Sequence, residues 1–115
     1  MNLNELAGAV HQTALAKGWY DTERSFPEVI ALMHSELSEA LEAYRDTGTE
    51  QLAEMWHSAP GNGTIKPEGA VVELADAIIR ILDTCAFYGM DIQGALDAKM
   101  AYNETRPYRH GNKRA

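Results

Sequence analysis

One stretch, from Val71 to Asp83, constrains the fold of this chain more than any other. Placed on a helix, its apolar residues cover an arc of about 220°, whereas a surface helix carries an apolar stripe of about 100°. We therefore expect a central helix that is mostly buried. Its charged side chains share the remaining sector: Glu73, Asp76, Arg80 and Asp83.

Acidic side chains on a buried helix are costly unless something compensates their charge. A metal ion is the simplest partner, and carboxylate oxygens favour Mg²⁺, with Mn²⁺ as the alternative. A second interpretation is a solvated helix edge on which Arg80 acts as the internal counter-ion. Asp83 is expected at the helix surface or behind the ligands, not among them.

Composition limits the class of protein. The chain has 115 residues, which predicts one domain with a single core. Its net charge of −7 argues against a nucleic-acid surface as the main function. It has neither an apolar run of about 20 residues nor a signal peptide, so we expect a cytoplasmic protein without a membrane partner. The lone Cys85 is expected to be a reduced core residue.

Capping signals and apolar spacing predict four helices and no strand. The expected helices run from Asn2 or Asn4 to about Lys17, from Ser25-Phe26-Pro27-Glu28 through Arg45, from Pro67-Glu68-Gly69 to Gly89, and from Asp91 to about Thr105. We expect a short helix over Thr49–Trp56, a loop over His57–Pro67, and a loosely held basic tail over 107–115. The expected fold is all-α and resembles a four-helix bundle.

The second predicted helix carries another acidic pair. Glu36 lies inside its apolar arc and Glu39 lies at the margin, while Glu42 lies on the polar side. Residues three apart share one helix face. Two antiparallel helices packed about 8–10 Å apart bring two such pairs to a common point, enough for one or two metal ions. The two pairs together therefore predict a buried acidic site.

At this point the chain resembles the all-α nucleoside triphosphate pyrophosphohydrolases of the MazG type, particularly the small single-domain proteins of bacteria and phages. The resemblance rests on three stretches, namely Ile30–Glu42, Lys66–Arg80 and Lys99–Pro107. It covers most of the chain. One departure is the length between Glu39 and Glu73, where 33 residues form a connection longer than is usual in the family. Within the predicted loop and insert over about 49–69, the insert itself lies around Gln51–Gly63, and substrate contacts are not carried over from the family to that region.

The resemblance implies Mg²⁺-dependent hydrolysis of a nucleoside triphosphate to a monophosphate and pyrophosphate. It implies four metal ligands: Glu36, Glu39, Glu73 and Asp76. Glu36 or Glu39 would be the general base. The phosphate chain would be held by Lys99, Asn103 and Arg106, from the same subunit or a neighbouring one. Trp19 is a hypothetical stacking partner for the base.

Two other classes of function compete with this interpretation. A di-iron or di-manganese bundle needs a Glu-x-x-His on each of two helices, and Glu54-x-x-His57 alone fits that motif. The other alternative is a non-enzymatic helical interaction module whose acids are surface charge. The wide apolar arc of the central helix needs more cover than 115 residues provide, which predicts a homo-oligomer, in the first place a dimer that completes the bundle.

Overall fold

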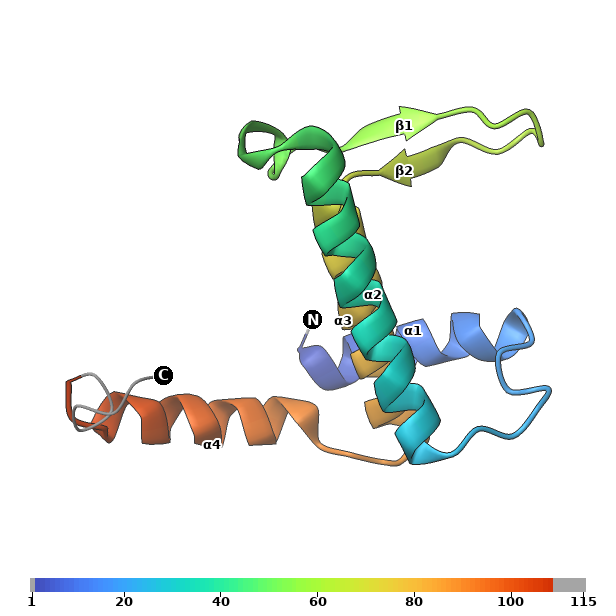
Figure 1. Ribbon diagram of the computed structural model, residues 1–115. Helices are drawn as coiled ribbons and strands as arrows, with labels where there is room; N and C mark the ends of the chain where they lie inside the picture. The colour runs from blue at the N-terminus through green and yellow to red at the C-terminus, as the bar shows by residue number, and fades with distance from the viewer. Residues whose placement is uncertain (1, 109–115) are drawn as a thin grey trace.

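The computed structural model describes residues 2–108 and is mostly helical (Figure 1). Its elements in order are α1 (Leu3–Ala16), α2 (Phe26–Thr47), η1 (Thr49–Gln51), β1 (Trp56–Ser58), β2 (Lys66–Glu68), α3 (Ala70–Phe87) and α4 (Ile92–Thr105). The four predicted helices are all present within these residues. The basic tail was predicted over 107–115, and its residues 109–115 lie outside the described part of the chain.

The helix starts follow from local capping chemistry. Asn2 accepts a hydrogen bond from the backbone N–H of Glu5 at 2.9 Å, and the Glu5 carboxylate accepts one from the N–H of Asn2. Ser25 and Glu28 form the same reciprocal capping box at the start of α2. These boxes satisfy backbone donors that have no partner within the helix, so both predicted starts are confirmed.

Helices α2 and α3 run side by side in opposite directions (Figure 1). Helix α1 packs across α3. Helix α4 follows the C-terminal end of α3 and extends away from the α2–α3 pair (Figure 1). It is tied to the start of α1, because Asn4 donates to Asp91 at 2.7 Å and the N–H of Leu3 donates to Gln93 at 2.8 Å.

The connection between α2 and α3 differs from the prediction. The expected helix over Thr49–Trp56 is reduced to the single 3-10 turn η1, and the expected loop over His57–Pro67 contains an antiparallel hairpin. Trp56 pairs with Glu68 and Ser58 pairs with Lys66. Each strand has only three residues, too few for the alternation of apolar and polar residues that reveals a strand in a sequence.

The prediction that the central helix is mostly buried holds for some of its apolar residues and not for others. Ala77, Leu82 and Cys85 are buried, as expected for the core side of α3. One face of α3, called the open side below, is uncovered in a single chain, and four apolar side chains on it are between 39% and 54% exposed: Val71, Leu74, Ile78 and Ile81. Of the helices the structure describes, none is long and apolar enough to cross a membrane.

Candidate functional site

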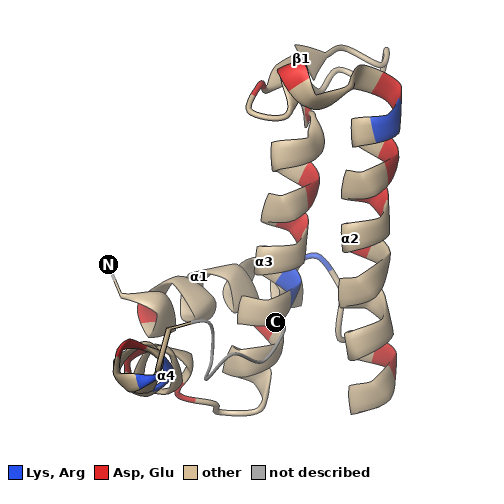
Figure 2. Ribbon diagram, turned by 60° about the vertical axis from the view of Figure 1, so that its left-hand side comes forward, with Lys and Arg blue, Asp and Glu red and all other residues tan. Residues whose placement is uncertain are grey.

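The predicted carboxylates meet between α2 and α3. Glu36, Glu73 and Asp76 each place one carboxylate oxygen within 4.8 Å of the other two. Glu39 also contacts this group, through a hydrogen bond with Glu73. Figure 2 shows acidic residues along both helices, with the hairpin above them. The antiparallel pairing of the helices brings Glu36 close to Glu73, which is 37 positions away in the sequence, and to Asp76, which is 40 positions away. Glu36, Glu73 and Asp76 are called the carboxylate cluster below.

Without a bound cation, the carboxylates of the cluster repel one another. Burial raises the pKa of Glu73 to about 7, helped by its hydrogen bond with Glu39 and by the charges of Asp76, Glu39 and Glu36. Burial also raises the pKa of Asp76, and the charge of Glu36 adds to this effect. Arg80 and Lys66 act in the opposite direction on Asp76. Carboxylates under such repulsion gain from a divalent cation, which removes the cost of ionising all of them.

Arg80 is the nearest compensating group on α3. Its Nε donates to Oε1 of Glu36 at 2.8 Å, and Glu36 is only 8% exposed. The guanidinium carbon lies 5.3 Å from the centroid of the Trp19 ring, within the range of a cation–π contact. Arg80 is therefore the counter-ion of Glu36 on α2, whereas the sequence predicted it as the counter-ion along the edge of its own helix. Glu73 and Asp76 have no ion pair with any residue in the described part of the chain.

Trp19 lies beside the cluster, although it comes from the turn after α1. Together with Asp76 it lines a cavity of about 290 Å³ whose other walls are mainly apolar. The remaining lining residues are Val10, Thr13, Ala14 and Ile79. A half-buried indole next to a carboxylate cluster can pack against a flat ring, as the sequence analysis supposed for Trp19.

A second cavity, of about 380 Å³, opens on the other side of Glu73, under the hairpin. Glu39 and Glu73 line it from the helices, and Trp56, Lys66 and Glu68 line it from the two strands. Glu42 and Asp46 border the same cavity. Glu42 is exposed, as expected for a residue off the apolar arc, and its Oε2 lies 3.5 Å from Nη1 of Arg45. The sequence analysis assigned no role to Lys66 or Trp56, because the strands that aim them at this cavity were not predicted.

The three predicted phosphate ligands do not reach the cluster within one chain. Lys99, Asn103 and Arg106 are all on or just after α4, which extends away from α2 and α3 (Figure 1). The Lys99 ammonium and the Arg106 guanidinium instead flank the ring of Tyr102, at 4.8 and 5.7 Å from its centroid. The role of these residues as phosphate ligands therefore stays a prediction.

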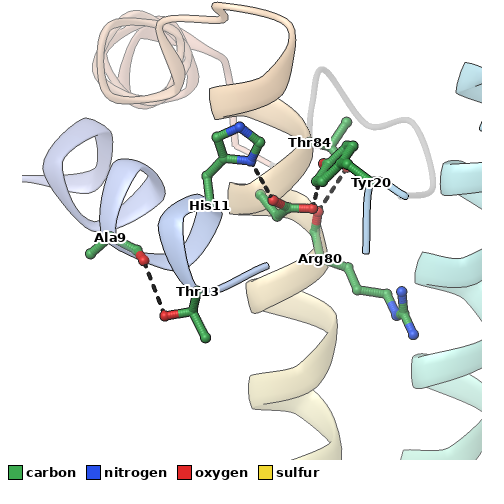
Figure 3. Close-up of polar contacts among 7 residues, drawn as sticks. Ala9, His11, Thr13, Tyr20, Arg80 and Thr84 are labelled. Atoms are coloured by element: carbon green, nitrogen blue, oxygen red, sulfur yellow. Dashed lines mark hydrogen bonds and ion pairs between the residues drawn. The ribbon is translucent and has the colours of Figure 1, made fainter. Parts of the chain in front are cut away.

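Asp83 was expected either at the helix surface or behind the metal ligands. The first of these expectations is wrong, and Asp83 is not among the three carboxylates of the cluster. It is 5% exposed and accepts hydrogen bonds from the Tyr20 hydroxyl at 2.6 Å and from Nδ1 of His11 at 2.8 Å (Figure 3). Phe87 stacks on Tyr20 with 4.7 Å between ring centroids. Asp83 thus ties α1 and the following turn to α3 and plays a structural part. The available signal was His11 on the apolar side of the first helix, since a polar group there requires a buried partner.

Comparison with known proteins adds no identification: no protein-family model, curated protein or solved structure matches this chain.

Proposed function

We propose that the protein hydrolyses nucleoside triphosphates to nucleoside monophosphates and pyrophosphate with Mg²⁺ bound at the carboxylate cluster. The observation that carries the proposal is the convergence of Glu36, Glu73 and Asp76 from two helices to within 4.8 Å. Two of these residues have pKa values raised by burial and by neighbouring negative charge. A cluster of this kind favours a bound divalent cation over three ionised carboxylates alone.

The donor set fits the proposed ion. All three residues, and Glu39 beside them, offer carboxylate oxygens, which suit Mg²⁺ and Mn²⁺ and do not suit softer metals. When bound, such an ion neutralises phosphate charge and lowers the pKa of a water. Glu36 and Glu39 are the proposed bases. Glu39 is the better placed of the two, because Glu36 is already held by Arg80 whereas Glu39 is exposed and borders the hairpin cavity.

The other residues near the cluster have roles that follow from their positions. The Trp19 ring borders the cavity that contains Asp76, and we assign it to stacking against the base of the substrate. Arg80 holds both the Glu36 carboxylate and the Trp19 ring, so it fixes the position of a proposed ligand relative to a proposed base-binding surface. These assignments depend on the proposed activity.

We further propose that the active form is a homodimer or a higher homo-oligomer. The radius of gyration is 17.1 Å, against about 13 Å for a compact chain of this length. The accessible surface is 8590 Å², against about 6200 Å² for a typical folded monomer of this mass. A second copy packed on the open side of α3 would cover part of that excess and could bring Lys99, Asn103 and Arg106 to the cluster.

The non-enzymatic alternative is supported by one observation, the ion pair between Arg80 and Glu36, since structural pairs of this kind also occur in helical interaction modules. It leaves Glu73 and Asp76 without an ion pair to any described residue. The alternative of a di-metal bundle depended on one sequence motif, Glu54-x-x-His57, which is not helical in the structure. Glu54 and His57 lie in the turn before β1 and in β1, so they do not form a helical Glu-x-x-His.

The test is a panel of canonical and modified NTPs and dNTPs with Mg²⁺, scored for pyrophosphate release, together with calorimetric titration of Mn²⁺. We expect release of pyrophosphate from at least one nucleotide. We also expect Glu73→Gln to weaken Mn²⁺ binding at least tenfold and to abolish turnover, because it removes a ligand at little change in volume. Arg45→Gln, on the exposed side of α2, is the control. Absence of both Mn²⁺ binding and a thermal shift with Mg²⁺ and nucleotide would favour the interaction module.

A further inference from the structure

The hairpin of β1 and β2 presents one of its faces to the carboxylate cluster. Directly opposed residues of an antiparallel pair have side chains on the same face, and successive residues alternate. The register Trp56–Glu68 and Ser58–Lys66 therefore puts Trp56, Lys66 and Glu68 on one face, and His57 on the other. Three of the four residues on the first face line the hairpin cavity, whereas Ser58, the fourth, and His57 do not.

Packing at the start of α3 holds the hairpin in this position. Gly69 is buried and has φ of +130°. A Cβ at Gly69 would lie 2.6 Å from the carbonyl oxygen of Glu54 and 3.3 Å from Cζ3 of Trp56. The Trp56 ring thus rests directly on the backbone that leads into α3. This contact fixes the cavity face of the hairpin relative to Glu73, one turn further along.

Lys66 is the single basic side chain among the described residues that line the hairpin cavity. Five carboxylates line the same cavity: Glu39, Glu42, Asp46, Glu68 and Glu73. Lys66 makes no ion pair with any of them in the part of the chain that the structure describes. Its charge nevertheless reaches the cluster, since it lowers the pKa of Asp76. An ammonium that is close to several carboxylates yet paired with none is available to an anionic ligand.

We propose that Lys66 contacts the phosphate chain of a metal-bound polyphosphate in the hairpin cavity, with Trp56 as the residue that positions the hairpin. The inference rests on the proposed function, and it adds a substrate contact that the same chain supplies to its own cluster. A free polyphosphate would be repelled by five carboxylates, and its divalent-metal complex is repelled less because each bound ion offsets two negative charges. Lys66 then meets the phosphate oxygens that project beyond the metal.

This role differs from simple screening of the carboxylates in one measurable respect. If Lys66 acts only through its charge at a distance, its removal strengthens the binding of Mn²⁺ alone and weakens the binding of the anionic metal–nucleotide complex by less than about tenfold, a loss that added salt removes. If Lys66 contacts phosphate, its removal strengthens or leaves unchanged the binding of Mn²⁺ alone, and weakens the binding of the complex at least about tenfold, a loss that persists in added salt. The size of the loss and its dependence on salt therefore separate the two roles.

The experiment compares wild-type protein with Lys66→Met, Lys66→Arg and two controls. Lys17→Met removes a lysine at the end of α1, and His57→Ala changes the opposite face of the hairpin. Mn²⁺ alone is titrated by calorimetry, and KM and kcat are measured with the nucleotide that the panel identifies. We expect Lys66→Met to raise KM at least tenfold, to bind Mn²⁺ as tightly as wild type or up to a few-fold more tightly, and to keep its melting temperature. Lys66→Arg should restore most of the affinity.

Each result decides a different claim. A KM that rises less than about tenfold in Lys66→Met, or a rise that added salt removes, with wild-type turnover and Mn²⁺ binding intact, overturns the role of Lys66 and leaves the proposed function standing. A tenfold rise of KM in Lys17→Met as well shows a general charge effect and also overturns it. Failure of the wild-type protein to bind Mn²⁺ or to hydrolyse any nucleotide overturns the proposed function, and the role of Lys66 with it.

Discussion

At the scale of single residues, Glu73 controls the pH dependence of stability. Its pKa is about 7 in the folded protein and near 4.5 when the chain is unfolded. The folded state therefore binds more protons than the unfolded state between these values, so the metal-free protein loses stability as the pH rises through this window. We expect a loss of about 1–3 kcal/mol between pH 4.5 and 7.5, measured by urea unfolding in a chelator.

Glu73→Gln and added cation are the two controls for that prediction. The variant should reduce most of the slope, because the group that titrates has been removed. Saturating Mn²⁺ should reverse the slope, since the ion binds the deprotonated carboxylates and is released as they gain protons. An identical pH profile in wild type and Glu73→Gln would show that another group is responsible.

Asp83 allows a second prediction at this scale. Its carboxylate is buried and holds both Tyr20 and His11, so Tyr20→Phe removes one donor and leaves the other. We expect Tyr20→Phe to lower the free energy of unfolding by about 1–2 kcal/mol, and Asp83→Asn by about 2–4 kcal/mol. The double variant should cost less than the sum, because both changes act on one network. Additive costs in urea unfolding would contradict the shared network.

At the scale of elements, Gly69 joins the hairpin to α3. Gly69→Ala introduces a Cβ that meets the Glu54 carbonyl oxygen at 2.6 Å, and it also strains the backbone. Gly48 is the matched control. It has φ of +78° and ψ of 176°, against +130° and 161° at Gly69, but a Cβ there would have no atom within 4 Å. We expect Gly48→Ala to cost about 1–2 kcal/mol and Gly69→Ala at least about 1 kcal/mol more.

The measurement is thermal or urea unfolding, with Trp56 fluorescence as a local probe of the hairpin. Gly69→Ala should shift the emission of Trp56, since the ring packs against the glycine, whereas Gly48→Ala should leave it unchanged. Equal costs and unchanged emission in both variants would mean that the hairpin does not pack on α3 as described.

The elements also show how far the sequence could be interpreted. The helices were predictable because capping boxes at Asn2 and Ser25 are local chemistry. The meeting of Glu36 with Glu73 and Asp76 was predictable because helical spacing fixes each pair on one face. The hairpin was missed because its stability comes from packing on Gly69, a contact that neither strand encodes by itself. The burial of Asp83 was missed for the same reason, since its partners come from another helix and a turn.

At the scale of the whole molecule, the open side of α3 allows a test of self-association. Ile78 is 54% exposed in the single chain and lies on the same face of α3 as Val71, Leu74 and Ile81. If this side contacts a second copy around a two-fold axis, Ile78→Gln removes apolar burial in both subunits. Each buried Ile contributes about 2 kcal/mol, so the dissociation constant should rise at least about 100-fold.

Sedimentation equilibrium over nanomolar to micromolar concentrations measures this effect directly. Ile65→Gln is the matched control, because Ile65 is 72% exposed but lies in the hairpin loop, away from α3. The control should associate like wild type, while Ile78→Gln should be monomeric at low micromolar concentration. Association also decides whether Lys99 and Arg106 can serve the cluster, because they need a neighbouring copy to reach it. A wild-type protein that stays monomeric throughout would therefore remove both cations from the proposed site and leave Lys66 as its remaining phosphate contact.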